Sequence, residues 1–525
     1  SEVSFTRASV LFSFADSFPK PGKKSSAKSL AKRVVVPSIY HITAIFKPLT
    51  IFSQQMEATL PSACRINEMD KDSDELKSFT HNLITQQFLS RVRGDLRTQV
   101  AGFLDSPSAF SLSTVAIGAA GSQKRLRSAS ELGTLISRLM TYRDAMPVYE
   151  SEFVSILEFI LMFFLDKCHD KWASVCSASE SALLVGDSEV MSAMQTDPVW
   201  RAIQMGNINV YSSEWNQWYG RQASEARSTY AVLFSLENAL LIRSPVHAGV
   251  LISTVEDAML IGALSTSLDW LSKLVLTSFD VLAVNHDRDP LKKIVAKDEV
   301  TAVTTRKARS KTVRNQRRVD ASALLSKDTS AVLTALSNRF QALSEQCLCT
   351  LRMELRSCAR QMVEKLKNEE FFLQEPSTQP HLCVVALNEK LLRLQDSLSE
   401  SLSPVKIRYL YNGLAHLIST LLVKLMPEIH SFNDLGIEKM LRNVLALQQC
   451  LTAIGTDDEG YFERTREYYM LLTMDSNAVL HLASERRYAF EFGDYEAVVK
   501  RLDVNPKKKE QILTTLHSLF NQFES

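Results

Sequence analysis

IRYLYNGLAHLISTLLVKLMPEIHSFNDLGIEKMLRNVLALQQCL, residues Ile407 to Leu451, is the stretch whose pattern decides the fold. Its first half places apolar residues three and four positions apart, which is the spacing of one buried helix face. Pro427 ends this run, because the residue before a proline is disfavoured in the helical conformation. A second apolar stripe runs from Ile437 to Leu451, and Asn433 or Asp434 can cap its start. The pattern predicts an antiparallel hairpin of two amphipathic helices that needs further helices on both sides.

Two residues of the first predicted helix bear on its packing and chemistry. A glycine inside a helix costs up to about 1 kcal/mol relative to alanine, so Gly413 predicts that another helix crosses closely there. His416 has no carboxylate or strong nucleophile one turn away along the chain. We therefore interpret His416 as a packed histidine rather than a general base.

The composition is that of a folded protein rich in helices. Of its 525 residues, 45% are apolar and 23% charged, which is typical of globular domains. The 16 glycines and 15 prolines are about half the usual usage of these residues, so turns are scarce and long helices are favoured. The length suits several domains or one extended stack of helical layers.

Overall charge and cysteine spacing exclude several classes of function. Lys and Arg number 60 against 59 Asp and Glu, a net charge of +1, so no global field favours a nucleic-acid partner. The eight cysteines form no C-x-x-C pair, and most stand at apolar helix positions, where a free cysteine acts as a small hydrophobe. We predict a reducing compartment, no disulfide framework and no metal.

Two stretches carry only basic charges, Lys20–Arg33 and 304–318. Such composition is typical of a solvated linker, which is the favoured interpretation of both. The alternative for both is contact with anionic lipid headgroups; for 304–318, nuclear import or RNA contact also stays open. The possible lipid contacts are Lys20, Lys23, Lys24, Lys28, Lys32, Arg306, Lys307, Arg309, Lys311, Arg314, Arg317 and Arg318.

The same spacing predicts helices along most of the chain, with few strands. We expect a linker at 1–33, a helical region at 34–284, a basic linker at 285–321 and a helical region at 322–525. Residues 39–46 are rich in β-branched side chains and are expected to be extended, with a helix opening at Pro48. Residues 107–127 are expected to be a loose connection. Further helices are predicted at 73–104, 129–142, 152–176, 226–243, 249–264, 264–282, 331–367, 382–402, 460–482, 488–502 and 507–523.

No local signature of catalysis is present in the sequence. There is no H-E-x-x-H pair, no G-x-S-x-G elbow and no dinucleotide or kinase motif. The stretch Gly118–Arg125 lacks the spacing of a phosphate loop. We therefore predict a protein that is not an enzyme and has no cofactor, with a helical enzyme as the remote alternative.

The hairpin resembles the C-terminal region of the exocyst complex component 4 family, the Sec-eight subunit. The resemblance rests on YLYNGLAHLIS (409–419), GIEKMLRNVLALQQ (436–449) and ERTREYYMLL (463–472). Weaker matches at 41–57 and 267–279 extend it upstream in the same order. The motif residues are interpreted as structural: Gly413, His416, Gly436, Arg442, Asn443, Gln448 and Gln449.

The resemblance implies an all-α fold, an elongated rod of stacked antiparallel helical bundles as in vesicle-tethering complexes. It implies a non-enzymatic subunit, corresponding to about the C-terminal half of the family, that tethers secretory vesicles to the plasma membrane before fusion. The implied partners are other exocyst subunits, especially component 3, with small GTPases and SNARE machinery reached through the complex. The implied location is cytoplasmic, peripheral at sites of secretion. The alternative function is a peripheral helical adaptor that binds anionic lipid through the two basic stretches.

Overall fold

The computed structural model describes most of the chain. The described residues are 38–59, 69–116, 122–176, 192, 195, 199, 200, 203, 235, 237, 252–278, 327–455, 459–485, 490–502 and 504–521. The predicted linkers at 1–33 and 285–321, and the predicted helix at 226–243 apart from residues 235 and 237, lie outside them.

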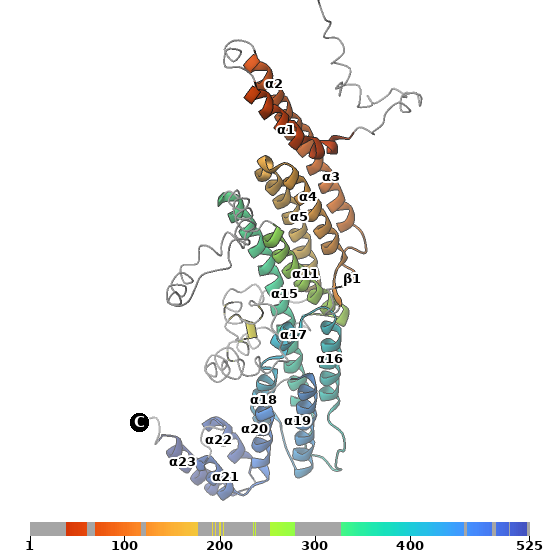
Figure 1. Ribbon diagram of the computed structural model, residues 1–525. Helices are drawn as coiled ribbons and strands as arrows, with labels where there is room; N and C mark the ends of the chain where they lie inside the picture. The colour runs from red at the N-terminus through yellow and green to blue at the C-terminus, as the bar shows by residue number, and fades with distance from the viewer. Residues whose placement is uncertain are drawn as a thin grey trace, which may run out of the picture. The chain divides into compact units, whose positions relative to one another are not determined.

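Helices make up nearly all of the described structure, which confirms the predicted all-α class (Figure 1). The first group of α-helices is α1 (Ile42–Thr59), α2 (Met69–Asn82), α3 (Leu89–Leu104), α4 (Arg127–Ala145), α5 (Glu150–Cys176) and α11 (Val255–Ser278). The second group is α15 (Lys327–Lys367), α16 (Leu382–Ser399), α17 (Pro404–Tyr411), α18 (Leu414–Leu425), α19 (Asp434–Ile454), α20 (Glu459–Met470), α21 (Ser476–Glu485), α22 (Phe492–Arg501) and α23 (Pro506–Asn521). The short turns are η4 (Ile39–His41), η7 (Pro147–Tyr149), η8 (Met426–Glu428), η9 (Leu471–Thr473) and the π-helical η5 (Leu83–Phe88).

The chain divides into two compact units. Unit 1 comprises Ser1–Phe103, Leu132–Leu161 and Ser326–Thr329, and unit 2 comprises Leu104–Glu131, Met162–Leu325 and Ser330–Ser525. Unit 2 therefore contains both α11, which precedes the predicted linker at 285–321 in sequence, and α16 to α23, which follow it. The predicted division of the chain at that linker stays a prediction.

In unit 1, the start of α1 is held by a cluster of aromatic side chains. The Tyr40 hydroxyl donates to Asp95 at 2.7 Å, and its ring centroid lies 5.9 Å from that of Phe88. Burial and the Asp95 hydrogen bond raise the pKa of Tyr40 above its usual value. The predicted extended segment at 39–46 is wrong, because Ile39–His41 is a 3-10 turn and α1 begins at Ile42, so Pro48 lies inside a helix. Tertiary packing here overrides β-propensity.

The expected loose connection at 107–127 is also wrong in part, because it contains an antiparallel strand pair. Strands β1 (Leu112–Ala116) and β2 (Ser122–Leu126) pair with Leu112 opposite Leu126. The backbone N–H of Leu126 donates to Ser267 of α11 at 3.0 Å, and the side chain of Leu126 is fully buried. The strand is thus anchored by a residue far along the chain, which its own sequence does not reveal.

In unit 2, the predicted hairpin is replaced by a layer of three helices. Helices α18 and α19 both pack chiefly against α20, which lies beside each of them in Figure 1. Helix α16 packs on the other side of α19 and also against α11. The two helices predicted at 249–264 and 264–282 are one continuous helix, α11. The neighbours expected for the hairpin are therefore present, but the pairing of its two helices is not.

The first helix of the predicted hairpin is in fact two helices with a break at Asn412 and Gly413. Helix α17 ends at Tyr411, and Gly413 precedes α18 with φ of 77° and ψ of 0°, a left-handed conformation. Glycine reaches this region without steric cost, whereas other L-residues do not. The interpretation of Gly413 as a close crossing point inside a helix is therefore wrong. Its role is to turn the chain between α17 and α18.

We expect Gly413→Ala to destabilise the protein by about 1–2 kcal/mol, because a Cβ disfavours the left-handed conformation. The matched control is Gly460→Ala in α20, where a Cβ meets nothing within 4 Å and alanine favours the helix. Thermal unfolding of both variants checks this. A Gly413→Ala midpoint equal to that of the control variant would contradict it.

Candidate functional site

The break between α17 and α18 is bound by two buried arginines of α15. Arg352 donates to the carbonyl of Tyr409 at 2.7 Å. Arg356 donates to the carbonyls of Leu410 and Asn412 at 3.0 and 2.7 Å. These carbonyls stand where a helix end leaves acceptors without helical partners. The two guanidinium groups therefore take the place of the missing helical N–H donors.

Glu237 pairs with the same two arginines and offsets one of their two positive charges. Its carboxylate oxygens accept from Arg352 Nε and Arg356 Nε, each at 2.7 Å, and all three side chains are almost fully buried. Burial alone would raise the pKa of Glu237, but the two guanidinium groups hold it below its usual value. The guanidinium carbon of Arg352 also lies 4.5 Å from the centroid of the Tyr409 ring. The arrangement is a closed ionic cluster, which we call the arginine cluster (Glu237, Arg352 and Arg356).

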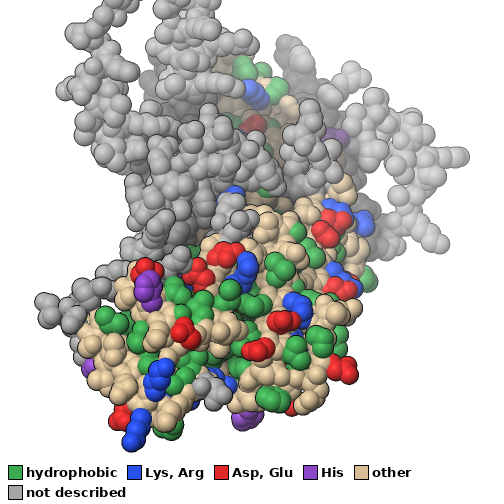
Figure 2. Space-filling model, turned by 90° about the horizontal axis from the view of Figure 1, so that it is seen from below, with side chains coloured by type: hydrophobic (Ala, Val, Ile, Leu, Met, Phe, Trp, Pro, Cys, Tyr) green, Lys and Arg blue, Asp and Glu red, His purple; other side chains and the backbone are tan. Residues whose placement is uncertain are grey.

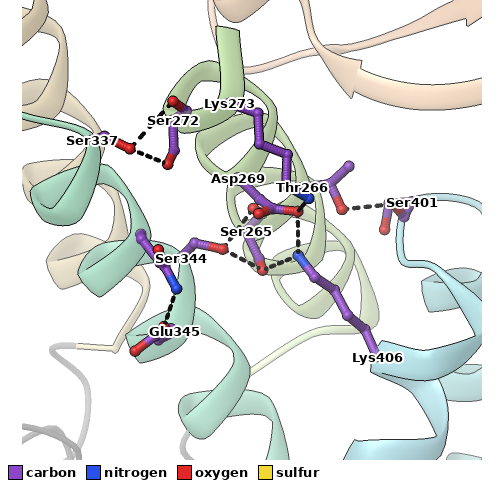
Figure 3. A network of polar contacts seen from close by, with 11 residues as sticks. Ser265, Thr266, Asp269, Ser272, Lys273, Ser337, Ser344, Glu345, Ser401 and Lys406 are labelled. Carbon is purple, nitrogen blue, oxygen red and sulfur yellow. Dashed lines mark hydrogen bonds and ion pairs between the residues drawn. The ribbon is translucent and has the colours of Figure 1, made fainter. Parts of the chain in front are cut away.

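A second buried polar layer joins α11 to α15 and α17 (Figure 3). Lys406 donates to Ser265 Oγ at 3.2 Å, and its Nζ lies 3.6 Å from Asp269. The hydroxyls of Ser265 and Ser344 lie 3.0 Å apart. Further along the same two helices, the Ser272 and Ser337 hydroxyls lie 2.7 Å apart. Burial lowers the pKa of Lys406, although Asp269 opposes this shift.

The Lys406–Ser265 pair has the composition of a serine–lysine nucleophile. A lysine of lowered pKa beside a serine hydroxyl can act as the base of an acyl-transfer enzyme. Ser265 is fully buried and Lys406 nearly so, and Ser265 also bonds to Ser344 within the helix contact. A substrate could reach this serine only if α11 and α15 separated. We therefore interpret the layer as packing rather than chemistry.

Asn433, at the start of α19, binds the connection between α15 and α16 through hydrogen bonds. Asn433 accepts from the backbone N–H groups of Gly436 and Leu373 at 2.9 and 3.1 Å and donates to the Leu373 carbonyl at 2.7 Å. A Cβ at Gly436 would lie 1.7 Å from the carbonyl oxygen of Phe371. Glycine is therefore required at 436 because the backbone of the connection passes directly over it.

The remaining motif residues of α19 lie at defined places. Arg442 donates to the Ser377 carbonyl and to Glu438, and Asn443 accepts from the His381 N–H at the start of α16 at 2.7 Å. Gln448 is half-buried and Gln449 is exposed. Gly436, Arg442 and Asn443 thus face one segment, 368–381. Their role as structural residues stays a prediction that these contacts support.

His416 lies in α18, and its ring packs edge-to-face with that of Tyr461 of α20, the ring centroids 4.8 Å apart. Burial, assisted by the nearby charge of Arg464, lowers the pKa of His416 to about 4. The side chain is therefore neutral at physiological pH. This agrees with the interpretation of a packed histidine, although its burial gives it an acid sensitivity that its sequence position does not predict.

The other candidate centres carry no evident chemistry. The described cysteines are free thiols, and burial raises the pKa of Cys168, Cys347 and Cys358. In the described part of the chain, no three His, Cys, Asp or Glu side chains stand close enough to hold a metal ion. A cavity of about 300 Å³ lies between the start of α11 and α16. Its buried carboxylate, Glu354, already accepts from the Ile252 N–H and from Lys390.

Helix α11 is long and apolar enough to cross a membrane by composition alone. In the structure, 61% of its apolar window is buried inside the protein. Ser265 and Ser272 of this helix bond to α15, and Thr266 donates to the Ser401 carbonyl at 2.8 Å. These contacts are those of a core helix.

All twelve predicted lipid-contact residues, in the ranges 20–32 and 306–318, lie outside the described residues. On the face seen in Figure 2, acidic and basic side chains of the described residues are interspersed with apolar ones. That face presents no large surface of one charge. Lipid contact therefore stays a prediction from the two basic stretches.

Sequence reasoning missed Arg352, Arg356 and Lys406. A signal was available, because Arg352 and Arg356 stand one turn apart among the buried Leu351, Leu355 and Ala359 of α15. A charged residue at a buried position needs a partner. The sequence does not say which of its 59 acidic residues that partner is.

Comparison with known proteins bears on identity. No family model matches the chain. Exocyst complex component SEC8 of Arabidopsis thaliana is 20% identical over 491 residues, covering 92% of this chain and 42% of that protein. Exocyst complex component 4 of Homo sapiens is 22% identical over 465 residues, covering 87% of this chain and 44% of that protein. The chain is similar to exocyst components. Over 177 residues, identity to the exocyst complex component 4 of Dictyostelium discoideum reaches 32%, covering 32% of this chain and 15% of that protein.

The chain thus spans less than half the length of the plant and human exocyst components. Among solved structures, the C-terminal domain of the exocyst subunit Sec6p matches with a TM-score of 0.40 and 10% identity, covering 85% of this chain and 93% of that one. This sequence similarity agrees with the resemblance of residues 407–451, because both are to exocyst components.

We expect Glu237→Gln to destabilise the protein by at least about 3 kcal/mol, because it leaves two buried guanidinium groups without their counter-charge. The matched control is Glu389→Gln, which removes a surface carboxylate whose pair with Arg393 is exposed and contributes about 1 kcal/mol or less. Denaturant unfolding of both variants measures the difference. Equal midpoints for the two variants would show that the arginine cluster does not need its carboxylate.

We expect His416 to make the protein acid-sensitive. Its pKa is lowered to about 4 in the folded protein. In the unfolded chain, His416 has its ordinary pKa of about 6.5, so between these two pH values the unfolded chain binds a proton that the folded protein does not bind. Stability is therefore full above pH 6.5 and falls as pH drops toward 4, by up to about 3 kcal/mol from this residue.

The check is unfolding free energy measured from pH 7 to pH 4.5 for the wild type, His416→Gln and His481→Gln. His481 is exposed on α21, so its variant should keep the wild-type slope, whereas His416→Gln should flatten it. Three parallel curves would refute the assignment.

Proposed function

We propose that this chain is the C-terminal part of an exocyst subunit, a non-enzymatic component of the complex that tethers secretory vesicles to the plasma membrane before fusion. The observation that carries the proposal is similarity to exocyst components of a plant and of animals over 87–92% of the chain. The all-α architecture supports it. Within the exocyst, the 407–451 motif favours component 4.

The mechanism that the structure supports is scaffolding by fixed helix packing. Helices α11, α15 and α17 are joined by two buried polar layers, the arginine cluster and the Lys406 layer. Breaking either layer leaves buried charges unpaired, which costs several kcal/mol. Such packing holds surface helices at set positions. That property suits a subunit that assembles with others, component 3 above all, and works at cytoplasmic sites beside the plasma membrane.

The test uses the full-length protein, tagged at its own locus and purified from the source cells. We expect mass spectrometry to recover the other exocyst subunits, with component 3 among the most abundant. The control is the same tag on an unrelated helical protein of similar size. Recovery of no exocyst subunit above that control would refute the proposal.

The lipid-adaptor alternative has a separate readout. Flotation of the purified chain with phosphatidylcholine vesicles, with and without phosphatidylserine, measures binding to anionic lipid. Charge reversal of Lys23, Lys24, Arg317 and Arg318 should abolish any such binding. Anionic-lipid binding lost in that variant, together with no recovered exocyst subunit, would favour the adaptor.

A further inference from the structure

The two-stranded sheet of unit 2 has one occupied edge and one open edge. On the β2 side, the backbone N–H of Lys124 donates to the Glu400 carbonyl at 3.3 Å, and that of Leu126 donates to Ser267 Oγ at 3.0 Å. Successive residues of a strand direct their backbone groups to opposite sides. Lys124 and Leu126 thus point away from β1, and other elements of the core occupy this edge of the sheet.

The edge on the β1 side is open. The register places Leu112 opposite Leu126 and Thr114 opposite Lys124. The backbone N–H and C=O groups of Leu112 and Thr114 therefore also point outward, away from β2. Within the described residues, no hydrogen bond reaches these backbone groups, and the Thr114 side chain is exposed. Such an edge is a template for another strand.

The sequence of β1 does not protect this edge. Proteins usually block an open edge with lysine, proline or a bulge. Strand β1 reads LSTVA (112–116), so it contains no charged residue and no proline. Its five residues pair one to one with those of β2, without a bulge. The strand is therefore suited to accept a third strand.

A positive charge beside this edge has no counter-charge. Arg125 of β2 lies opposite Ser113 of β1, and its guanidinium carbon stands 4.6 Å from the centroid of the Trp270 ring. The Nε atom of Arg125 is buried and has no hydrogen-bond partner among the described residues, and burial lowers the pKa of this side chain. In the same part of the chain no carboxylate pairs with Arg125, although both neighbouring basic residues have such pairs. A carboxylate placed here would form a charge-assisted hydrogen bond.

A third strand beside β1 would bring a carboxylate within reach of Arg125. The residue opposite Ser113 on an added strand lies on the same face of the sheet as Arg125, two strand spacings or about 10 Å away. On that face the small Ser113 side chain lies between them, and arginine and glutamate side chains together span the distance. The residues on either side of that glutamate lie on the other face, with Leu112 and Thr114. The segment that fits best is therefore a carboxylate flanked by β-branched or apolar residues.

A second copy of the chain does not supply this carboxylate. Strand β1 has no acidic residue, so pairing β1 with β1 of another copy would leave Arg125 without a counter-charge. We propose that the β1 edge binds an extended segment of another protein as a third strand, through the backbone of Leu112 and Thr114 and a carboxylate that pairs with Arg125. This site does not depend on the proposed function, and the two are tested by different experiments.

The probe is a library of random peptides of about ten residues, displayed on phage and selected on the full chain. We expect enrichment of peptides in which Glu or Asp is flanked by β-branched residues. Thr114→Pro should weaken binding of an enriched peptide by about tenfold, because proline removes an outward N–H. Proline is tolerated where a strand N–H faces solvent, so this variant should fold. The matched control, Thr114→Val, keeps the N–H and should bind as the wild type does.

The role of Arg125 has a separate test, an exchange of charges. Arg125→Glu should lose the acidic peptide and bind the same peptide with lysine in place of its carboxylate, which a merely destabilised protein would not do. Addition of the acidic peptide to the wild type should slow hydrogen exchange at 112–116. Peptides from α20 should not respond.

No enrichment of acidic peptides, or equal binding by the wild type and Thr114→Pro, would overturn the proposal. So would a dimer of the chain that forms with rising concentration and is lost in Thr114→Pro, because a second copy would then occupy the edge.

Discussion

The fold of unit 2 depends on the hydrogen bonds by which two buried arginines bind the helix break at Asn412 and Gly413. A buried carbonyl without a hydrogen-bond partner costs about 1–3 kcal/mol, and the end of α17 presents several. Arg352 and Arg356 satisfy those of Tyr409, Leu410 and Asn412. Burying two guanidinium groups is costly in turn unless a carboxylate accompanies them. Glu237 supplies it, so one set of contacts satisfies these carbonyls and offsets one of the two positive charges.

The break then decides what α18 can contact. Gly413 turns the chain in a left-handed conformation, and α18 leaves it to pack along α20. Ser419 of α18 donates to the Tyr461 carbonyl, and Thr465 of α20 donates to Ser419 at 2.7 Å. A continuous helix from 404 to 425 would direct these residues elsewhere. The layer of α18, α19 and α20 therefore follows from a break of two residues.

Sequence periodicity predicted the helices well and the break not at all. The helix expected at 331–367 is α15, 327–367, because one apolar stripe runs its whole length. The apolar spacing also continues across Asn412 and Gly413, so periodicity alone does not separate α17 from α18. Gly413 permits the turn, and the arginine cluster, whose residues are distant in sequence, binds the carbonyls at the break. The same holds for β2, anchored by Ser267, and for Lys406, whose partners stand on α11.

Buried charge also has a structural role in this core. Apolar residues of similar shape would often stabilise a core as well as a buried ion pair does. However, two apolar stripes can shift by one helical turn, about 5.4 Å, and still bury each other. The ion pair of Lys406 with Asp269 and the hydrogen bond from Arg356 to the Asn412 carbonyl form in one register only. In the described residues, which are almost all helical, such contacts fix register, and register sets the position of each outer helix face.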